Sequence, residues 1–158
     1  MRMDSSVRSE VAAGGPALFR LVRFWSRRWA ADPRRGLSGN VAHVLILEAI
    51  DTAAADGPAA IAKVAAELGL DRSNASRMLA DAVSAGLVAK TVAAGDARRA
   101  ELAITAGGRT LLASARAWQG DMFARLVQDW PAEDARRFAG YLRRLASQPP
   151  PLDEGDQR

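Results

Sequence analysis

The residues with the clearest chemical potential in this sequence are arginines and serines that recur within one short helical segment. With Arg72 at 0° and an advance of about 100° per residue, small or cationic side chains fall between roughly 0° and 140°. Apolar side chains fall between roughly 240° and 340°. Arginine can bond a guanine edge or a phosphate, and serine and a helix N-terminus suit phosphate oxygens. The alternative is an ordinary solvated helix face. The first arc holds Arg72, Ser73, Ser76, Arg77 and Ala80, and the second holds Ala75, Met78, Leu79 and Ala82.

Arg77 can act on a nucleic acid in two ways. It can neutralise a phosphate, which is the role we expect because phosphate and sugar take half to two-thirds of protein–DNA hydrogen bonds. It can instead bond a base edge bidentately, which would make it a reader of sequence. The two roles differ in whether its loss weakens binding to all sequences or to one.

A second cationic group follows where the sequence period changes, after Gly86. Residues 87–92 and 100–104 favour two strands, and the charged, turn-like residues 93–99 lie between them. Arg98 and Arg99 would then stand at the tip of a hairpin, from which a guanidinium could enter a minor groove. Asp96 could hold this tip by hydrogen bonding to the backbone or to Arg98. A charged turn alone is usually only solvated, but this one follows a helix with a polar face.

Helical patterns surround these two groups. Pro16 suits the first position of a helix that ends near residues 32–36, and Ser38 is a plausible N-cap for the next helix. Residues 61–68 form a short amphipathic helix that stops at Gly69, and Asp71 can cap the helix that follows. Two short helices joined by a tight turn form a helix-turn-helix. Thr105 can cap a long helix, and Pro131 starts the last one, which ends before the prolines at 149–151.

Composition narrows the classes of protein that this chain can represent. Its 158 residues are 49% hydrophobic and 25% charged, with a net charge of +4, as in soluble globular proteins. Residues 1–16 contain no apolar signal core, so we expect a cytoplasmic protein. The absence of cysteine and the single histidine exclude thiol chemistry, cysteine-ligated zinc and a histidine-rich metal site. We therefore expect no metal, no cofactor, no membrane insertion and no enzymatic activity.

Several segments in order resemble one family of bacterial regulators. Residues 64–73 read VAAELGLDRS, residues 86–88 read GLV, residues 96–99 read DARR and residues 104–109 read ITAGGR. This order resembles the MarR family, in which a D-x-R wing is followed by a strand and an L-T-x-x-G helix start. The close match spans residues 59–112, and the flanking helices fit over residues 17–147. By position, Asp96 corresponds to the wing aspartate and Arg98 to the minor-groove arginine, and residues 72–77 open the recognition helix.

The resemblance implies a mainly α fold with a small β-hairpin wing, built as a winged helix-turn-helix plus a helical dimerisation lobe. We expect a flexible arm at 1–16, a dimerisation lobe from 17–55 and 106–148, a DNA-binding lobe at 56–105 and a disordered tail at 149–158. The resemblance further implies a homodimer built from the first and last helices. The sequence supports the dimer independently, since both terminal helices carry apolar faces that a small monomer would struggle to cover.

The resemblance also implies an effector pocket between the two lobes. Our candidates for its lining are Trp25, His43, Glu48 and Trp118, which would suit a small aromatic or anionic ligand. Each has a plainer alternative. Glu48 could be a polar residue near a helix end, His43 could lie at the surface or the edge of the core, and the tryptophans could belong to the core or to a dimer interface.

These patterns predict a sequence-specific, DNA-binding transcriptional regulator. With the resemblance, they lead us to expect a homodimeric repressor that a small molecule releases from double-stranded DNA, in a bacterial protein that associates with the nucleoid when bound to DNA. The alternative is a winged helix that binds proteins and has no sequence-specific affinity for DNA. The candidate DNA-contacting residues are Arg72, Ser73, Asn74, Ser76, Arg77, Asp96, Arg98 and Arg99.

Overall fold

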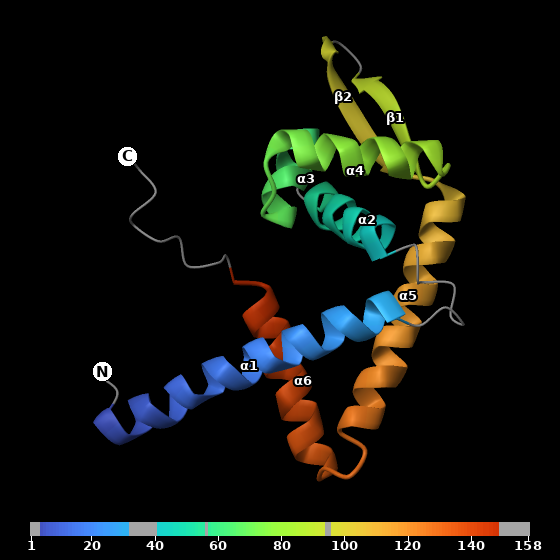
Figure 1. The fold of residues 1–158 in the computed structure, drawn as a ribbon. Coiled ribbons are helices and arrows are strands. Elements are labelled where there is room, and N and C mark those ends of the chain that lie inside the picture. The colour runs from blue at the N-terminus through green and yellow to red at the C-terminus, as the bar shows by residue number, and fades with distance from the viewer. Residues whose placement is uncertain (1–3, 32–40, 56, 94–95, 149–158) are drawn as a thin grey trace. The chain divides into compact units, whose positions relative to one another are not determined.

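The computed structural model describes residues 4–31, 41–55, 57–93 and 96–148 (Figure 1). Within them the chain is mainly α-helical with one β-hairpin, which confirms the expected fold class. None of the described helices is long and apolar enough to cross a membrane. The elements are α1 (Ser5–Ala31), α2 (Val41–Ala54), α3 (Ile61–Leu68), α4 (Arg72–Ser84), β1 (Val88–Ala93), β2 (Asp96–Ile104), α5 (Ala106–Leu126) and α6 (Ala132–Ala146).

The chain divides into two compact units within helix α5. The first unit spans Met1–Ala115 and the second spans Arg116–Arg158. The first unit holds the elements that carry the candidate DNA contacts, and the second holds the end of α5 and all of α6. Each unit is described by itself below.

Helices α2, α3 and α4 pack together with the hairpin around one hydrophobic core. Ile46, Leu47 and Ile50 of α2 are buried at its centre, and Val64 of α3 and Leu79 of α4 pack among them. Full burial of such a side chain is worth about 1.5–3 kcal/mol. Figure 1 shows α4 beside α2 and α3, with the hairpin extending beyond α4. Helix α2, which we expected in a lobe with the terminal helices, therefore contributes to the core beneath the helix-turn-helix.

The turn between α3 and α4 is built as the sequence predicted. Gly69 ends α3 in the left-handed conformation, with φ 61°, and its N–H bonds the carbonyl of Ala66. A residue with a Cβ adopts this conformation with difficulty, so glycine suits the position. Asp71 then caps α4, two residues later. This short connection fixes the start of α4 relative to α3.

Strands β1 and β2 form an antiparallel hairpin whose base belongs to the core. Val88 pairs with Ile104 and Lys90 pairs with Leu102, and both Val88 and Leu102 are buried. The N–H of Leu102 also bonds the carbonyl of Ala59, just before α3. These contacts anchor the hairpin to the helix-turn-helix.

The hairpin is longer than the sequence indicated. We expected a turn over residues 93–99, but β2 begins at Asp96, and its register against β1 shifts between Val92 and Ala93. Arg98 and Arg99 thus lie within the strand rather than in the turn. Ala100 pairs with Val92 and Asp96 pairs with Ala93, so pairing at both ends holds this segment in the strand despite the weak strand propensity of Asp96-Ala97.

The start of the first helix also differs from the prediction. We expected a flexible arm over residues 1–16 and a helix that begins at Pro16, but α1 begins at Ser5 and contains Pro16. The N–H of Arg8 bonds the carbonyl of Asp4, which starts the helix early. Residues such as Val11, Ala12 and Ala13 favour or tolerate a helix, and one interior proline did not end it. The expected tail at 149–158 lies outside the described residues.

Hydrogen bonds connect the start of helix α5 to the turn that follows α4, and we call this connection the joint. The Thr105 side chain caps α5 as predicted, because its Oγ1 accepts from the N–H of Gly108 at 3.1 Å. The same hydroxyl donates to the carbonyl of Gly86 at 2.7 Å, and the N–H of Thr105 bonds the carbonyl of Leu87. A Cβ at Gly108 would lie 2.2 Å from the Leu87 carbonyl oxygen, so only glycine fits this approach. The joint locks the start of α5 to the end of the helix-turn-helix.

The second unit is a helical hairpin held by aromatic side chains. Phe138 of α6 lies 6.0 Å from Phe123 of α5 and 5.3 Å from Trp130, measured between ring centroids. Offset aromatic pairs of this kind add about 0.5–1.5 kcal/mol beyond burial. Glu133 and Asp134 lie in the first turn of α6, and Arg143 and Arg144 lie in its last turn. Charges of these signs stabilise the two ends of the helix because they complement its dipole.

Candidate nucleic-acid interface

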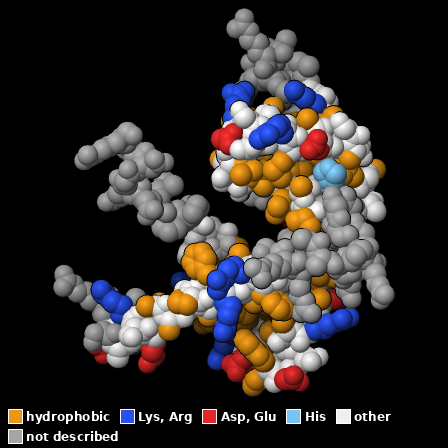
Figure 2. All heavy atoms as spheres, in the orientation of Figure 1, with side chains coloured by type: hydrophobic (Ala, Val, Ile, Leu, Met, Phe, Trp, Pro, Cys, Tyr) orange, Lys and Arg blue, Asp and Glu red, His pale blue; other side chains and the backbone are white. Residues whose placement is uncertain are grey.

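The outer face of α4 carries the predicted hydrogen-bonding and cationic residues. Arg72, Ser73 and Arg77 are exposed, and Ser76 is half-buried at the edge of the face. The opposite face of α4, with Ala75, Leu79 and Ala82, is buried in the core as predicted. Figure 2 shows cationic side chains on the surface over α4, with acidic groups between them and a hydrophobic strip over α2. The helical period therefore separated the core face from the solvent face correctly.

The N-terminus of α4 is organised by Asp71. One carboxylate oxygen, Oδ1, accepts from the backbone N–H groups of Ser73 and Asn74, each at 2.9 Å. The other oxygen, Oδ2, accepts from the side-chain amide of Asn74. These bonds satisfy N–H groups that a helix N-terminus leaves without an intrahelical partner.

These hydrogen bonds lower the pKa of Asp71. The backbone N–H of Asn74 is the largest cause, opposed by partial desolvation and helped by the Asn74 side chain and the Ser73 N–H. All of these bonds favour the ionised carboxylate, which accepts but cannot donate. Asp71 is therefore a carboxylate over a wider pH range than an ordinary aspartate.

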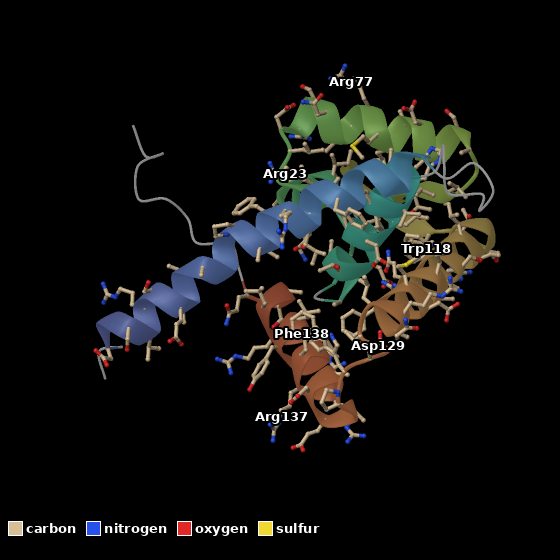
Figure 3. All side chains as sticks on the ribbon, turned by 60° about the horizontal axis from the view of Figure 1, so that its bottom comes forward. Arg23, Arg77, Trp118, Asp129, Arg137 and Phe138 are labelled. Carbon is tan, nitrogen blue, oxygen red and sulfur yellow. The ribbon has the colours of Figure 1, made fainter. Side chains whose placement is uncertain are left out.

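Asn74 continues this arrangement to Arg77. Its side-chain oxygen Oδ1 accepts from Nη2 of Arg77, one turn further along the helix. Arg77 projects from the outer side of α4 into solvent (Figure 3). The sequence reasoning assigned Asn74 to the reading residues and Asp71 to the cap, but missed that the two are joined to Arg77. The spacing of three residues between each pair is the signal that could have indicated it.

The wing residues are placed by their backbone. Asp96, Arg98 and Arg99 all lie in β2, and their side chains fall outside the described part of the structure. Lys90 and Thr91 of β1 are exposed on the same hairpin. Lys90 is a wing cation that the sequence reasoning did not single out, because it stands inside a predicted strand.

The four candidates for the effector pocket are distributed over the two units of the chain. His43 and Glu48 are both half-buried on α2, but five residues separate them, so their directions differ by about 140° around the helix. Trp118 is half-buried and belongs to the second unit. The Trp25 side chain lies outside the described residues. Among the residues that the structure describes, no group of histidine and acidic side chains could hold a metal ion.

Fold and surface together define a winged helix-turn-helix protein with a cationic, hydrogen-bonding face on the second helix of the motif. A model of the MarR family matches residues 35–99, which span α2 to the start of β2. This segment is therefore a MarR family winged helix-turn-helix, as the sequence motifs indicated. No curated protein sequence matches the chain.

Solved structures of MarR regulators share the fold over most of their length. A MepR mutant from S. aureus bound to an oligodeoxyribonucleotide is 20% identical, with a TM-score of 0.56 over 84% of this chain and 95% of that one. A MarR family regulator from Silicibacter pomeroyi is 21% identical, with a TM-score of 0.58 over 82% and 84%. The YusO protein from Bacillus subtilis is 17% identical, with a TM-score of 0.57 over 92% and 98%.

Proposed function

We propose that the protein is a sequence-specific DNA-binding transcriptional regulator that works as a homodimeric repressor. The observation that carries this proposal is the outer face of α4, where arginine and serine side chains are exposed on the second helix of a MarR-type winged helix. In helix-turn-helix proteins this helix enters the major groove with its N-terminal residues toward base edges. The DNA-bound MepR structure supports the same kind of partner here.

In this proposal the two cationic elements have different tasks. The N-terminal half of α4 forms the major-groove face, on which Arg72, Ser73, Asn74, Ser76 and Arg77 lie. The wing supplies the minor-groove contact through Arg98, supported by Asp96 and Arg99. The hairpin base is buried at Val88 and Leu102, so the wing is anchored to the core. Contacts in both grooves fix the orientation of the protein on the duplex and also add to its affinity.

The dimer is supported by apolar surface on the terminal helices. Phe19 and Val22 of α1 are 69% and 56% exposed, and Tyr141 and Leu145 of α6 are 63% and 53% exposed. Exposed apolar side chains of this size on one helix are typical of an interaction site. A second copy of the chain would cover both helices and place two α4 helices for two half-sites.

Release by a small molecule would act through the geometry of the dimer. Half-sites about 34–36 Å apart require that both reading helices keep their separation. A ligand that binds one arrangement of the helices better than another shifts the population toward it and weakens both DNA contacts together. Trp25, His43, Glu48 and Trp118 remain our candidates for its site, and an aromatic or anionic molecule remains the expected class.

Selection from a pool of random duplex DNA by the full-length protein tests the proposal. Sequencing of the retained fragments should give a pseudo-palindromic motif with half-sites about 10–10.5 base pairs apart, centre to centre. The alternative, a winged helix that binds proteins, predicts no enriched motif. A pool retained without sequence preference would favour that alternative and contradict the proposal.

A further inference from the structure

Three side chains at the start of α4 form one chain of hydrogen bonds. Asp71 accepts from the amide nitrogen Nδ2 of Asn74, and the amide oxygen Oδ1 of Asn74 accepts from Nη2 of Arg77. The residues follow one another at intervals of three, so all are neighbours along one side of the first helical turns. The chain ends at the guanidinium that projects toward solvent (Figure 3).

The direction of this chain is dictated by Asp71. An ionised carboxylate only accepts hydrogen bonds, so the amide of Asn74 must turn its NH2 group toward Asp71. Its carbonyl oxygen then faces Arg77, which only donates. Each partner thus meets the complementary group, and the cap holds Asn74 in the single orientation that also receives the arginine.

This arrangement has opposite consequences for Asn74 and Arg77 as readers of bases. Asparagine reads adenine by using its amide N–H2 and C=O together, and here both groups are already used within the helix. Arginine reads guanine by two N–H groups directed at O6 and N7. Of its five N–H donors, the bond to Asn74 uses one, and that bond fixes the plane of the others.

Orientation matters far more for a base edge than for a phosphate. A bidentate contact requires the guanidinium plane to match the base plane, whereas a phosphate accepts a cation from many directions. Holding the side chain in place before binding reduces the conformational entropy lost on binding. The chain of hydrogen bonds therefore favours the base-reading role of Arg77 over the phosphate role that the sequence alone suggested.

We propose, on the basis of the proposed function, that Asn74 is a positioning residue that orients Arg77 toward a guanine in each half-site and does not itself read adenine. Arg77 is then the residue that determines specificity at that base pair. Asp71 acts through Asn74, because its carboxylate sets the direction of the amide.

Two variants break the chain in different ways. Asn74→Ala removes the middle link. Asp71→Asn keeps an oxygen that can accept from Ser73 and Asn74, but it presents an N–H2 group to Asn74. The Asn74 amide would then reverse, and its own N–H2 group would face Arg77 donor against donor. Ser73→Ala is the matched control, since its hydroxyl lies on the same face and its side chain takes no part in the chain of bonds.

The test measures affinity of the full-length protein for the duplex enriched from a random pool, and for copies with each base pair substituted. Arg77→Ala should weaken binding by about tenfold or more and remove the preference for guanine at one position. Asn74→Ala and Asp71→Asn should reduce the preference for guanine at the same base pair. In the Arg77→Ala background neither should cause a further loss, whereas Ser73→Ala should act additively. Circular dichroism establishes that each variant is folded.

Three results would overturn the inference. A loss from Asn74→Ala that persists in the Arg77→Ala background would make Asn74 a direct contact. Unchanged base preference in both Asn74→Ala and Asp71→Asn would show that Arg77 needs no positioning. An equal loss of affinity from Arg77→Ala on every duplex would show that Arg77 contacts a phosphate and does not read a base. These three leave the regulator proposal standing, whereas a wild-type protein that enriches no motif overturns both.

Discussion

Among single residues, Arg98 is the one whose substitution best tests DNA binding without disturbing the fold. The hairpin that carries it is anchored at its base by Val88 and Leu102. Arg98→Ala should weaken binding to the enriched duplex by about 1–3 kcal/mol, the range of a good base contact. The protein should stay folded, because the residues that anchor the hairpin to the core lie at its base. A gel-shift titration gives the affinity. Arg136→Ala, which removes the same charge from an exposed position on α6, is the matched control and should change affinity little.

The Asp71 cap should make the free energy of unfolding depend on pH in the acidic range. Because the folded protein lowers the pKa of Asp71, the carboxylate stabilises the fold fully above the unfolded-state pKa, near 3.9. That contribution disappears as the pH falls through the lower folded-state pKa. The difference in unfolding free energy between wild type and Asp71→Ala should therefore be constant above about pH 5 and shrink below about pH 4. An unchanged difference at low pH would contradict the role of the ionised cap.

The residues of α4 show which part of the site the sequence could predict. The face of Arg72, Ser73 and Arg77 followed from helical spacing, because the buried and exposed sides of an amphipathic helix repeat along the chain. The bonds that join Asp71, Asn74 and Arg77 did not follow, since they depend on side-chain rotamers that spacing leaves open. Arg98 and Arg99 lie in the hairpin as expected, but within β2 rather than in the turn.

At the scale of elements, Gly108 is the residue on which the joint between α5 and the helix-turn-helix depends. A Cβ there would meet the Leu87 carbonyl oxygen at 2.2 Å and Ile104 Cγ2 at 2.8 Å. Gly108→Ala should therefore destabilise the protein by about 1–3 kcal/mol, the usual cost of overpacking. Urea unfolding followed by circular dichroism measures the change.

Gly120 of the same helix is the matched control. A Cβ at this position meets no atom of the described residues within 4 Å. Gly120→Ala should stabilise α5 by about 0.5–1 kcal/mol, because alanine loses less backbone freedom than glycine in a helix. Equal effects of the two substitutions would show that the close approach at Gly108 does not constrain the fold.

Local signals predicted most element boundaries, and the two failures lie at the start of α1 and at the start of β2. Gly69, Asp71 and Thr105 act within a few residues of themselves, so their roles as caps and stops could be read directly. The start of β2 at Asp96 depends on pairing with a strand that precedes it, and α1 continues through Pro16 although proline usually ends or kinks a helix. The strand boundary therefore depends on a partner outside the segment, whereas the helix boundary depends on how far helix-tolerant neighbours outweigh one proline.

At the scale of the whole molecule, α6 should be required for dimerisation. A chain that ends after Trp130 loses Phe138, Leu142 and Leu145, each worth about 1.5–3 kcal/mol if buried in the dimer. Leu145→Asp tests the same surface more gently, because this side chain is 53% exposed and a charge there need not disturb the fold. Both variants should sediment as monomers, and a dimeric Leu145→Asp would place the interface elsewhere.

The central claim is that this chain recognises a DNA sequence through the outer face of α4. The most direct measurement compares binding of wild type and Arg77→Ala to the enriched duplex and to a scrambled duplex, at two salt concentrations. The account predicts that wild type binds the enriched duplex at least about 10³-fold more tightly. It further predicts that the loss from Arg77→Ala, about 1–3 kcal/mol, is concentrated on that duplex. Equal affinity of wild type for both duplexes, or no loss from Arg77→Ala on either, would contradict the claim that α4 reads the sequence.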